Sequence, residues 1–142
     1  MTSLCLRLII EGMKQNVSAR LEFEKGFKGH LKLKEGEIGI GINDNEAKPY
    51  DMLQGALAAC LHSTFLDILE KKRIGLDFAR YEISGVKRET PPTTLESVVI
   101  KVTLPKGHEE ALRKSMDLAT KYCSVYTTIS KVAEMQLELV FE

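Results

Sequence analysis

The sequence predicts an α+β fold, with small antiparallel sheets packed around one long buried helix. Segments that alternate between apolar and polar residues occur at both ends of the chain, as half-buried strands require. A long apolar stretch in the middle of the chain ends in a cluster of charges, which is typical of a buried helix. The expected order, β-β-β-α-β-β-α-β, differs from the repeated strand–helix–strand unit of a parallel sheet.

The first three strands are expected between residues 17 and 42. Residues 17–24 alternate strictly, and the turn over residues 25–29 has two glycines able to take positive φ before alternation resumes at residues 30–34. After a second turn, residues 38–42 form the third strand. Gly39 and Gly41 share one face of this strand, which predicts that another element packs closely against its backbone.

A long helix is expected from Tyr50 to about Arg73, with Pro49 in its first turn and Gly75 closing it. Its first half is apolar on all sides and rich in glycine and alanine. This composition predicts a helix that is buried on most sides and closely approached by its neighbours. We therefore expect it at the centre of the molecule.

The second half of the chain completes the fold. Strands are expected at about Phe78–Arg88 and Ser97–Leu104, separated by a pair of prolines. A second helix is expected from His108 to about Tyr122, with two glutamates in its first turn, where the helix dipole favours negative charge. A shorter helical segment through Lys131 and a last strand at residues 136–141 follow.

The length of 142 residues fits a single domain. We assign residues 17–142 to that domain and residues 1–16 to an N-terminal arm or extension. The apolar residues near the start fit a strand or a helix equally well, because a short apolar run does not distinguish the two.

Composition excludes several classes of function. Lys and Arg number 20, as do Asp and Glu, so the formal net charge is zero, which argues against nucleic acid as a partner. The longest uncharged stretch, Met52–Leu66, is shorter than the roughly 20 apolar residues of a membrane-spanning helix, so no membrane span is expected. Three widely spaced cysteines do not form the framework of a small disulfide-rich secreted protein, and a cytoplasmic location is expected.

Two of the cysteines are candidates for chemistry. Cys60 lies in the apolar central helix and Cys123 follows the second helix, whereas Cys5 is left over. A lone cysteine is more often a small core residue than a reactive thiol. Two cysteines on two helices of one domain could nevertheless meet, if their Cα atoms lie within about 7 Å. Adding His62 does not make a metal site, because residues i and i+2 of a helix do not face together, and no metal is expected.

Both cysteines lie in motifs that resemble those of the OsmC/Ohr family, named for osmotically inducible protein C and organic hydroperoxide resistance protein. The segment Pro49–Cys60 is similar to the family's Pro-Glu-x-Leu followed by Ala-Ala-Cys, and residues 119–125 are similar to its Cys-Pro-Val motif. The spacing of the cysteines and the order of elements over residues 17–142 are also similar. The chain is therefore expected to be a divergent OsmC-like member.

This resemblance implies an intertwined homodimer and a thiol-dependent peroxidase that reduces organic hydroperoxides. Cys60 would attack the peroxide as a thiolate and become a sulfenic acid, and Cys123 would condense with it to a disulfide. An external dithiol, such as a dihydrolipoyl group, would restore the pair, and no bound cofactor is expected. Because burial alone would suppress the Cys60 thiolate, we also expect a cation nearby.

The family's supporting residues have no direct counterparts here. The family uses an Arg from the first hairpin turn and a Glu after the helix-opening proline, whereas here the turn has lysines and a tyrosine follows Pro49. Lysine supplies charge without the planar fork of arginine. The candidate supporting residues are therefore Arg20, Lys25, Lys28, Tyr50 and Asp51.

These departures, together with Ser124 in place of the usual proline, leave a second hypothesis open. In this alternative the chain is a non-catalytic OsmC-fold dimer that binds a small apolar ligand or acts as a thiol redox sensor.

Overall fold

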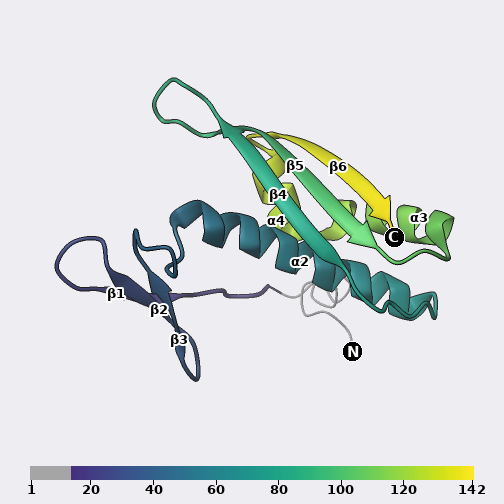
Figure 1. Cartoon of the computed structure of the whole chain (residues 1–142), viewed down its shortest axis with the longest axis horizontal. Coiled ribbons are helices and arrows are strands. Elements are labelled where there is room, and N and C mark those ends of the chain that lie inside the picture. Colours follow the sequence, from purple (N-terminus) through teal and green to yellow (C-terminus); the bar gives the residue numbers. More distant parts are fainter. Residues whose placement is uncertain (1–13) are drawn as a thin grey trace.

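The computed structural model describes residues 14–142, which form two three-stranded sheets and three helices (Figure 1). The predicted α+β class and the order of the main elements are confirmed. The arm expected at residues 1–16 lies almost wholly outside the described residues.

The first sheet is antiparallel, in the order β1 (Arg20–Phe23), β2 (Gly29–Lys32) and β3 (Glu37–Ile40). Only Gly26 of the first turn takes positive φ, at 82°. Gly29 instead starts β2, where an added Cβ would collide with the Glu22 backbone and the Phe23 ring. The close packing expected at Gly41 comes from the Glu46 side chain of the following loop and not from another helix or strand.

The central helix α2 (Pro49–Lys71) begins as predicted, with Pro49 in the first turn. The Asp51 carboxylate accepts a hydrogen bond from the Lys48 backbone N–H at 2.9 Å and so completes the capping of this end. The other end differs from the prediction. Arg73, and not Gly75, takes the left-handed conformation that ends the helix, with φ of 56°.

The second sheet corrects the expectation of purely antiparallel pairing. Strands β4 (Arg80–Lys87) and β5 (Leu95–Leu104) are antiparallel, but β6 (Glu134–Phe141) pairs with β5 in parallel. Between β5 and β6 the chain crosses over through α3 (Glu109–Tyr122) and α4 (Ser124–Ser130), and a parallel pair requires such a crossover. Alternation in the sequence predicts strands but not their relative direction, which is why this pairing was missed.

The core lies between the second sheet and the helices (Figure 1). Alternate residues of β5 point into it, and the C-terminal half of α2 packs against them together with α3 and α4. The fully buried large side chains include Leu57, Leu61, Phe65, Val98, Ile100, Val102, Leu104, Leu112 and Met116. By length and composition alone α2 could also cross a membrane, but a core helix passes the same test.

Two apolar surfaces remain exposed in the single chain, contrary to expectation. All four residues of β1 are exposed, and the β1–β3 sheet stands apart from the other sheet, near the start of α2 (Figure 1). The first half of α2, expected to be buried on most sides, exposes Leu53, Gly55, Ala56 and Ala59. The sequence predicts that both surfaces are buried, but no other part of residues 14–142 covers them.

The core assignment gives a stability prediction. Phe65→Ala removes a side chain that is 0% exposed, and we expect it to lower the free energy of unfolding by about 3–5 kcal/mol. Urea denaturation at a fixed protein concentration measures this loss. Lys114→Ala on the exposed face of α3 is the control, with an expected change within about 0.5 kcal/mol. Equal midpoints for the two variants would contradict this assignment of the core.

Candidate functional site

The fold brings Cys60 and Cys123 together. Cys60 lies on α2 between the fully buried Leu57 and Leu61, and Cys123 lies at the junction of α3 and α4. The Cys60 sulfur is 3.9 Å from the Ser124 hydroxyl oxygen, so it lies against the residue that follows Cys123. The two thiols also interact directly with each other. Both cysteines are thiols rather than halves of a disulfide, and Cys60 is the more accessible of the two.

The junction between α3 and α4 fixes the position of Cys123. Its backbone is extended, with φ of −73° and ψ of 115°, so α3 ends there and α4 begins at the next residue. Its sulfur accepts a hydrogen bond from the Tyr126 backbone N–H at 3.4 Å and thereby caps α4. The sulfur is held in place by the backbone of the helix that follows it.

The surroundings of Cys123 hold its thiol in the protonated form. Burial raises the pKa of Cys123 to about 12, against the opposing effect of the Tyr126 N–H. The neighbouring Cys60 contributes to this rise, because two negative charges on adjacent sulfurs repel each other. Cys123 is therefore a neutral thiol at physiological pH.

Aromatic and imidazole side chains line the neighbourhood of the pair. The Nδ1 atom of His62 lies 2.9 Å from the Tyr81 hydroxyl, and the two rings meet edge to face at 80°. Burial raises the pKa of Tyr81, with Cys123 adding to the shift, and burial also raises the pKa of Tyr126. Burial lowers the pKa of His62. These groups are neutral at physiological pH, so they form an uncharged wall.

His62 directs its ring nitrogen to Tyr81 and not toward a shared ligand with the two sulfurs. Within residues 14–142, no group of three or more His, Cys, Asp or Glu side chains is placed to hold a metal ion.

The candidate supporting residues occupy two other places. Asp51 caps the start of α2, and the Lys87 ammonium of β4 lies 4.8 Å from the centre of the Tyr50 ring. Arg20 lies in β1, and Lys25 and Lys28 lie between β1 and β2. Among residues 14–142 these three cations make no ion pair, and their sheet stands apart from the core (Figure 1). Within one chain, the structure joins none of the five to the sulfur pair.

Sequence reasoning missed three side chains that contact α2 from other elements. Ser124 was noted only as a departure from a motif, and its contact with Cys60 depends on how α4 packs against α2. Tyr81 and Lys87 lie on β4 and reach α2 through the antiparallel run of that strand along the helix. No local pattern in the sequence indicates these contacts, because they depend on the register between a strand and a helix.

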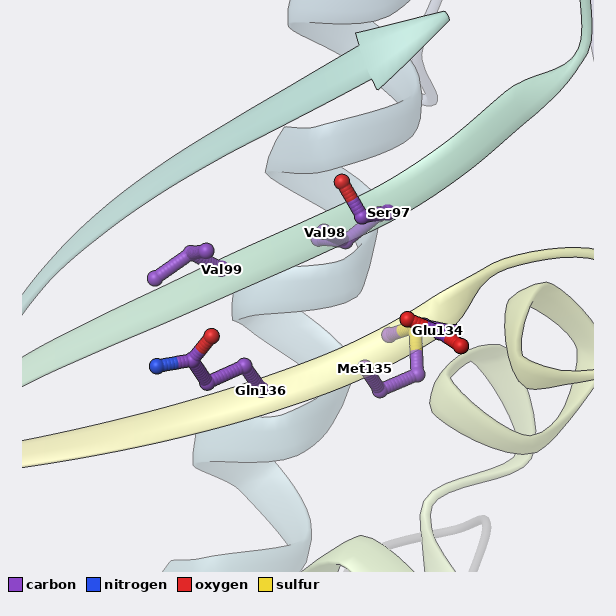
Figure 2. Close-up of a pocket in the computed structure, with 6 residues that line it drawn as sticks. All are labelled: Ser97, Val98, Val99, Glu134, Met135 and Gln136. Atoms are coloured by element: carbon purple, nitrogen blue, oxygen red, sulfur yellow. The ribbon is translucent and has the colours of Figure 1, made fainter. Parts of the chain in front are cut away.

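A shallow hollow lies on β5 and β6, away from the two cysteines (Figure 2). Ser97, Val99, Glu134 and Gln136 border it, with Val98 and Met135 at its floor. Its lining contains no cysteine, so the hollow is separate from the sulfur pair.

Solved structures share this fold. A hypothetical protein from Aquifex aeolicus VF5 is 25% identical with a TM-score of 0.80, over 91% of this chain and 98% of that one. An OsmC like protein from Mycoplasma pneumoniae is 14% identical with a TM-score of 0.80, over 91% and 99%. The organic hydroperoxide resistance protein OhrB of Bacillus subtilis is 17% identical with a TM-score of 0.66, over 87% and 98%.

A search of curated proteins found no match. A family model described as OsmC-like protein, by contrast, matches residues 42–138, which include α2 and the segment around Cys123. The match covers more than half of the sequence, and the resemblance first found in the two cysteine motifs is confirmed: the chain belongs to the OsmC-like protein family.

Proposed function

We propose that this protein is a cysteine-dependent peroxidase that reduces organic hydroperoxides, with Cys60 as the attacking thiol and Cys123 as the resolving thiol. The observation that carries the proposal is the placement of two cysteine thiols against each other between α2 and the α3–α4 junction. Family membership supports it. Solved structures with the same fold include organic hydroperoxide resistance proteins from Legionella pneumophila and Bacillus subtilis.

The proposed reaction has two steps on the protein. The Cys60 thiolate attacks the terminal peroxide oxygen, an S–O bond forms as the O–O bond breaks, and the alkoxide takes a proton and leaves as an alcohol. The Cys123 sulfur then attacks the Cys60 sulfur. An S–S bond forms as the S–O bond breaks, and the hydroxide leaves as water with the Cys123 proton. The contact between the thiols makes this second step unimolecular.

The environments of the two cysteines support this division of roles. Cys123 is 0% exposed and neutral at physiological pH, so it is a poor first nucleophile. Cys60 is partly exposed and is the sulfur that a peroxide can approach. The apolar side chains of α2 on either side of Cys60 suit an alkyl group on the peroxide.

Regeneration needs an external reductant, because no group in residues 14–142 supplies electrons. A dithiol, for example a protein-bound dihydrolipoyl group, would reduce the Cys60–Cys123 disulfide by thiol–disulfide exchange. Such a cycle suits a reducing compartment, so we place the protein in the cytoplasm.

We further propose that the active form is a homodimer. The small apolar residues exposed on the first half of α2 would let a second copy of this helix approach closely. The β1–β3 sheet exposes the large apolar side chains of Leu21, Phe23 and Ile38, and a contiguous exposed apolar surface is typical of an interface. A second copy would bring the cations of this sheet, Arg20, Lys25 or Lys28, toward the Cys60 of its partner and so stabilise the thiolate.

A second candidate function is a non-catalytic dimer that binds a small apolar ligand or senses oxidants through its thiols. The turn between β1 and β2 favours it, because Lys25 and Lys28 stand where the family's enzymes use Arg. In this case Cys60 reacts with peroxide no faster than an ordinary thiol, and the experiments below separate the two functions.

Substitution of each cysteine tests the proposed reaction. We expect Cys60→Ser to abolish consumption of cumene hydroperoxide in the presence of dithiothreitol. In the absence of dithiothreitol, Cys123→Ser should still consume one equivalent and should accumulate a sulfenic acid at Cys60 that dimedone labels. Cys5→Ser is the matched control and should retain full turnover. If the unsubstituted protein shows no turnover, the peroxidase proposal is wrong and the alternative stands.

Alkylation as a function of pH tests the protonation of Cys123. Since burial raises its pKa to about 12, iodoacetamide near pH 7 should label Cys60 first and leave Cys123 unlabelled. Labelling of Cys123 should rise as the pH approaches that value. Mass spectrometry of the labelled peptides measures both sites, and urea-unfolded protein, in which the two sites label alike, is the control. Preferential labelling of Cys123 at neutral pH would contradict this assignment.

The same pKa shift predicts how stability depends on pH. The folded chain holds the Cys123 proton more tightly than the unfolded chain, whose thiol has an ordinary pKa of 9.0. The resulting stabilisation is fully present below that ordinary value and is lost as the pH rises toward about 12. Urea midpoints across the alkaline range should fall more steeply for the unsubstituted protein than for Cys123→Ser.

Sedimentation tests the dimer. We expect a mass twice the 15.9 kDa of one chain, and Ala59→Glu on the exposed face of α2 should shift it to a monomer because a charge would be buried between helices. Lys121→Glu on the exposed end of α3 is the control and should stay dimeric. A monomer for the unsubstituted protein at tens of micromolar would exclude the proposed assembly.

A further inference from the structure

A hydroxyl group lies beside the sulfur of Cys60. The Oγ atom of Ser124 is 3.9 Å from the Cys60 Sγ, within the longer reach of hydrogen bonds to sulfur. Ser124 is exposed and Cys60 is partly exposed, so their contact lies on the side of the sulfur pair that a substrate can approach. Hydrogen bonds at catalytic groups are often long in the resting state and shorten during the reaction.

The start of α4 fixes this hydroxyl. Cys123 is the N-cap of the helix, Ser124 is its first residue, and the Ser124 carbonyl accepts a hydrogen bond from the Thr128 hydroxyl at 2.8 Å. Both residues are therefore held by the same helix, and Ser124 presents its hydroxyl to Cys60 while Cys123 presents its thiol.

The backbone here does not require a serine. The first position of a helix accepts proline, because the N–H of that residue has no partner within the helix. Cys123 has the extended backbone, with ψ of 115°, that a following proline demands. A proline at position 124 is thus compatible with the start of the helix but removes the hydroxyl.

We propose that Ser124 is a further catalytic residue, whose hydroxyl donates a hydrogen bond to the Cys60 thiolate and then to the sulfenic oxygen. This inference rests on the proposed peroxidase function. In the first step an S–O bond forms between the Cys60 thiolate and the terminal peroxide oxygen as the O–O bond breaks, the alkoxide takes a proton from water and leaves as an alcohol, and the Ser124 O–H bond is not broken. The hydroxyl acts by stabilising charge first on the sulfur and then on the sulfenic oxygen.

The other groups around the pair make such a donor important. Besides Cys123 itself, the titratable side chains around the pair are Tyr126 in α4 and Tyr81 in β4, which both interact with Cys123, and His62 in α2, which lies against Tyr81. All are neutral at physiological pH, as described above. A hydrogen bond to an ionised sulfur is stronger than one between neutral groups, so the hydroxyl stabilises the thiolate more than the thiol.

Three variants at position 124 test the proposal. Ser124→Ala and Ser124→Pro both remove the hydroxyl, and we expect each to raise the apparent pKa of Cys60 by about one unit. The rate of Cys60 oxidation by cumene hydroperoxide at neutral pH should fall about tenfold in both. Ser124→Thr keeps a hydroxyl and should remain within about twofold of the unsubstituted protein. Ser130→Ala, at the far end of α4, is the control and should behave like the unsubstituted protein.

The pKa is measured by alkylation of Cys60 against pH, and the oxidation rate by stopped flow. A higher Cys60 pKa and a slower oxidation in Ser124→Ala and Ser124→Pro, but not in Ser124→Thr, support the role of the hydroxyl. An unchanged pKa and rate in Ala and Pro overturns it, even if the unsubstituted protein is an active peroxidase. A different result is that the unsubstituted protein resists oxidation at Cys60 while the Cys60 pKa still rises in Ser124→Ala and Ser124→Pro. That result would support the hydrogen bond from Ser124 and contradict the peroxidase function.

Discussion

The packing of α2 against the junction of α3 and α4 is the contact on which the rest of the site depends. The C-terminal half of α2 carries Leu61, Phe65 and Leu69 into the core, and these residues fix the helix against β5. With α2 fixed, Cys60 occupies one position relative to the extended residue Cys123. The hydrophobic core therefore sets the distance between two cysteine thiols that lie far apart in the sequence.

Much of this arrangement follows from the sequence. The proline in the first turn of α2, the glutamates in the first turn of α3 and the alternation of β5 each follow a local rule, and each element forms close to where that rule predicts it. The two cysteines were also identified from motifs on these elements. The relative direction of β6 was not, because a strand shows the same alternation whether it pairs in parallel or antiparallel.

Burial and contacts across the fold were harder to predict. The glycines and alanines of α2 indicate a buried surface, but sequence does not say whether the covering atoms belong to the same chain. The end of α2 at Arg73 also escaped prediction, since glycine usually takes the left-handed conformation found there. Ser124 illustrates the same limit at the site, because its contact with Cys60 depends on where α4 packs.

The positions of the two cysteines also determine which elements a disulfide between them would enclose in a covalent loop. The proposed disulfide between Cys60 and Cys123 would close a loop that contains β4, β5 and α3, whereas the β1–β3 sheet and β6 would lie outside it. Closing a loop of roughly 60 residues lowers the entropy of the unfolded chain by an amount worth about 4 kcal/mol. Oxidation would thus stabilise the folded chain by restricting the unfolded segment that contains β4, β5 and α3. The oxidised form would then melt at a higher temperature than the reduced form, so thermal unfolding would distinguish the two forms.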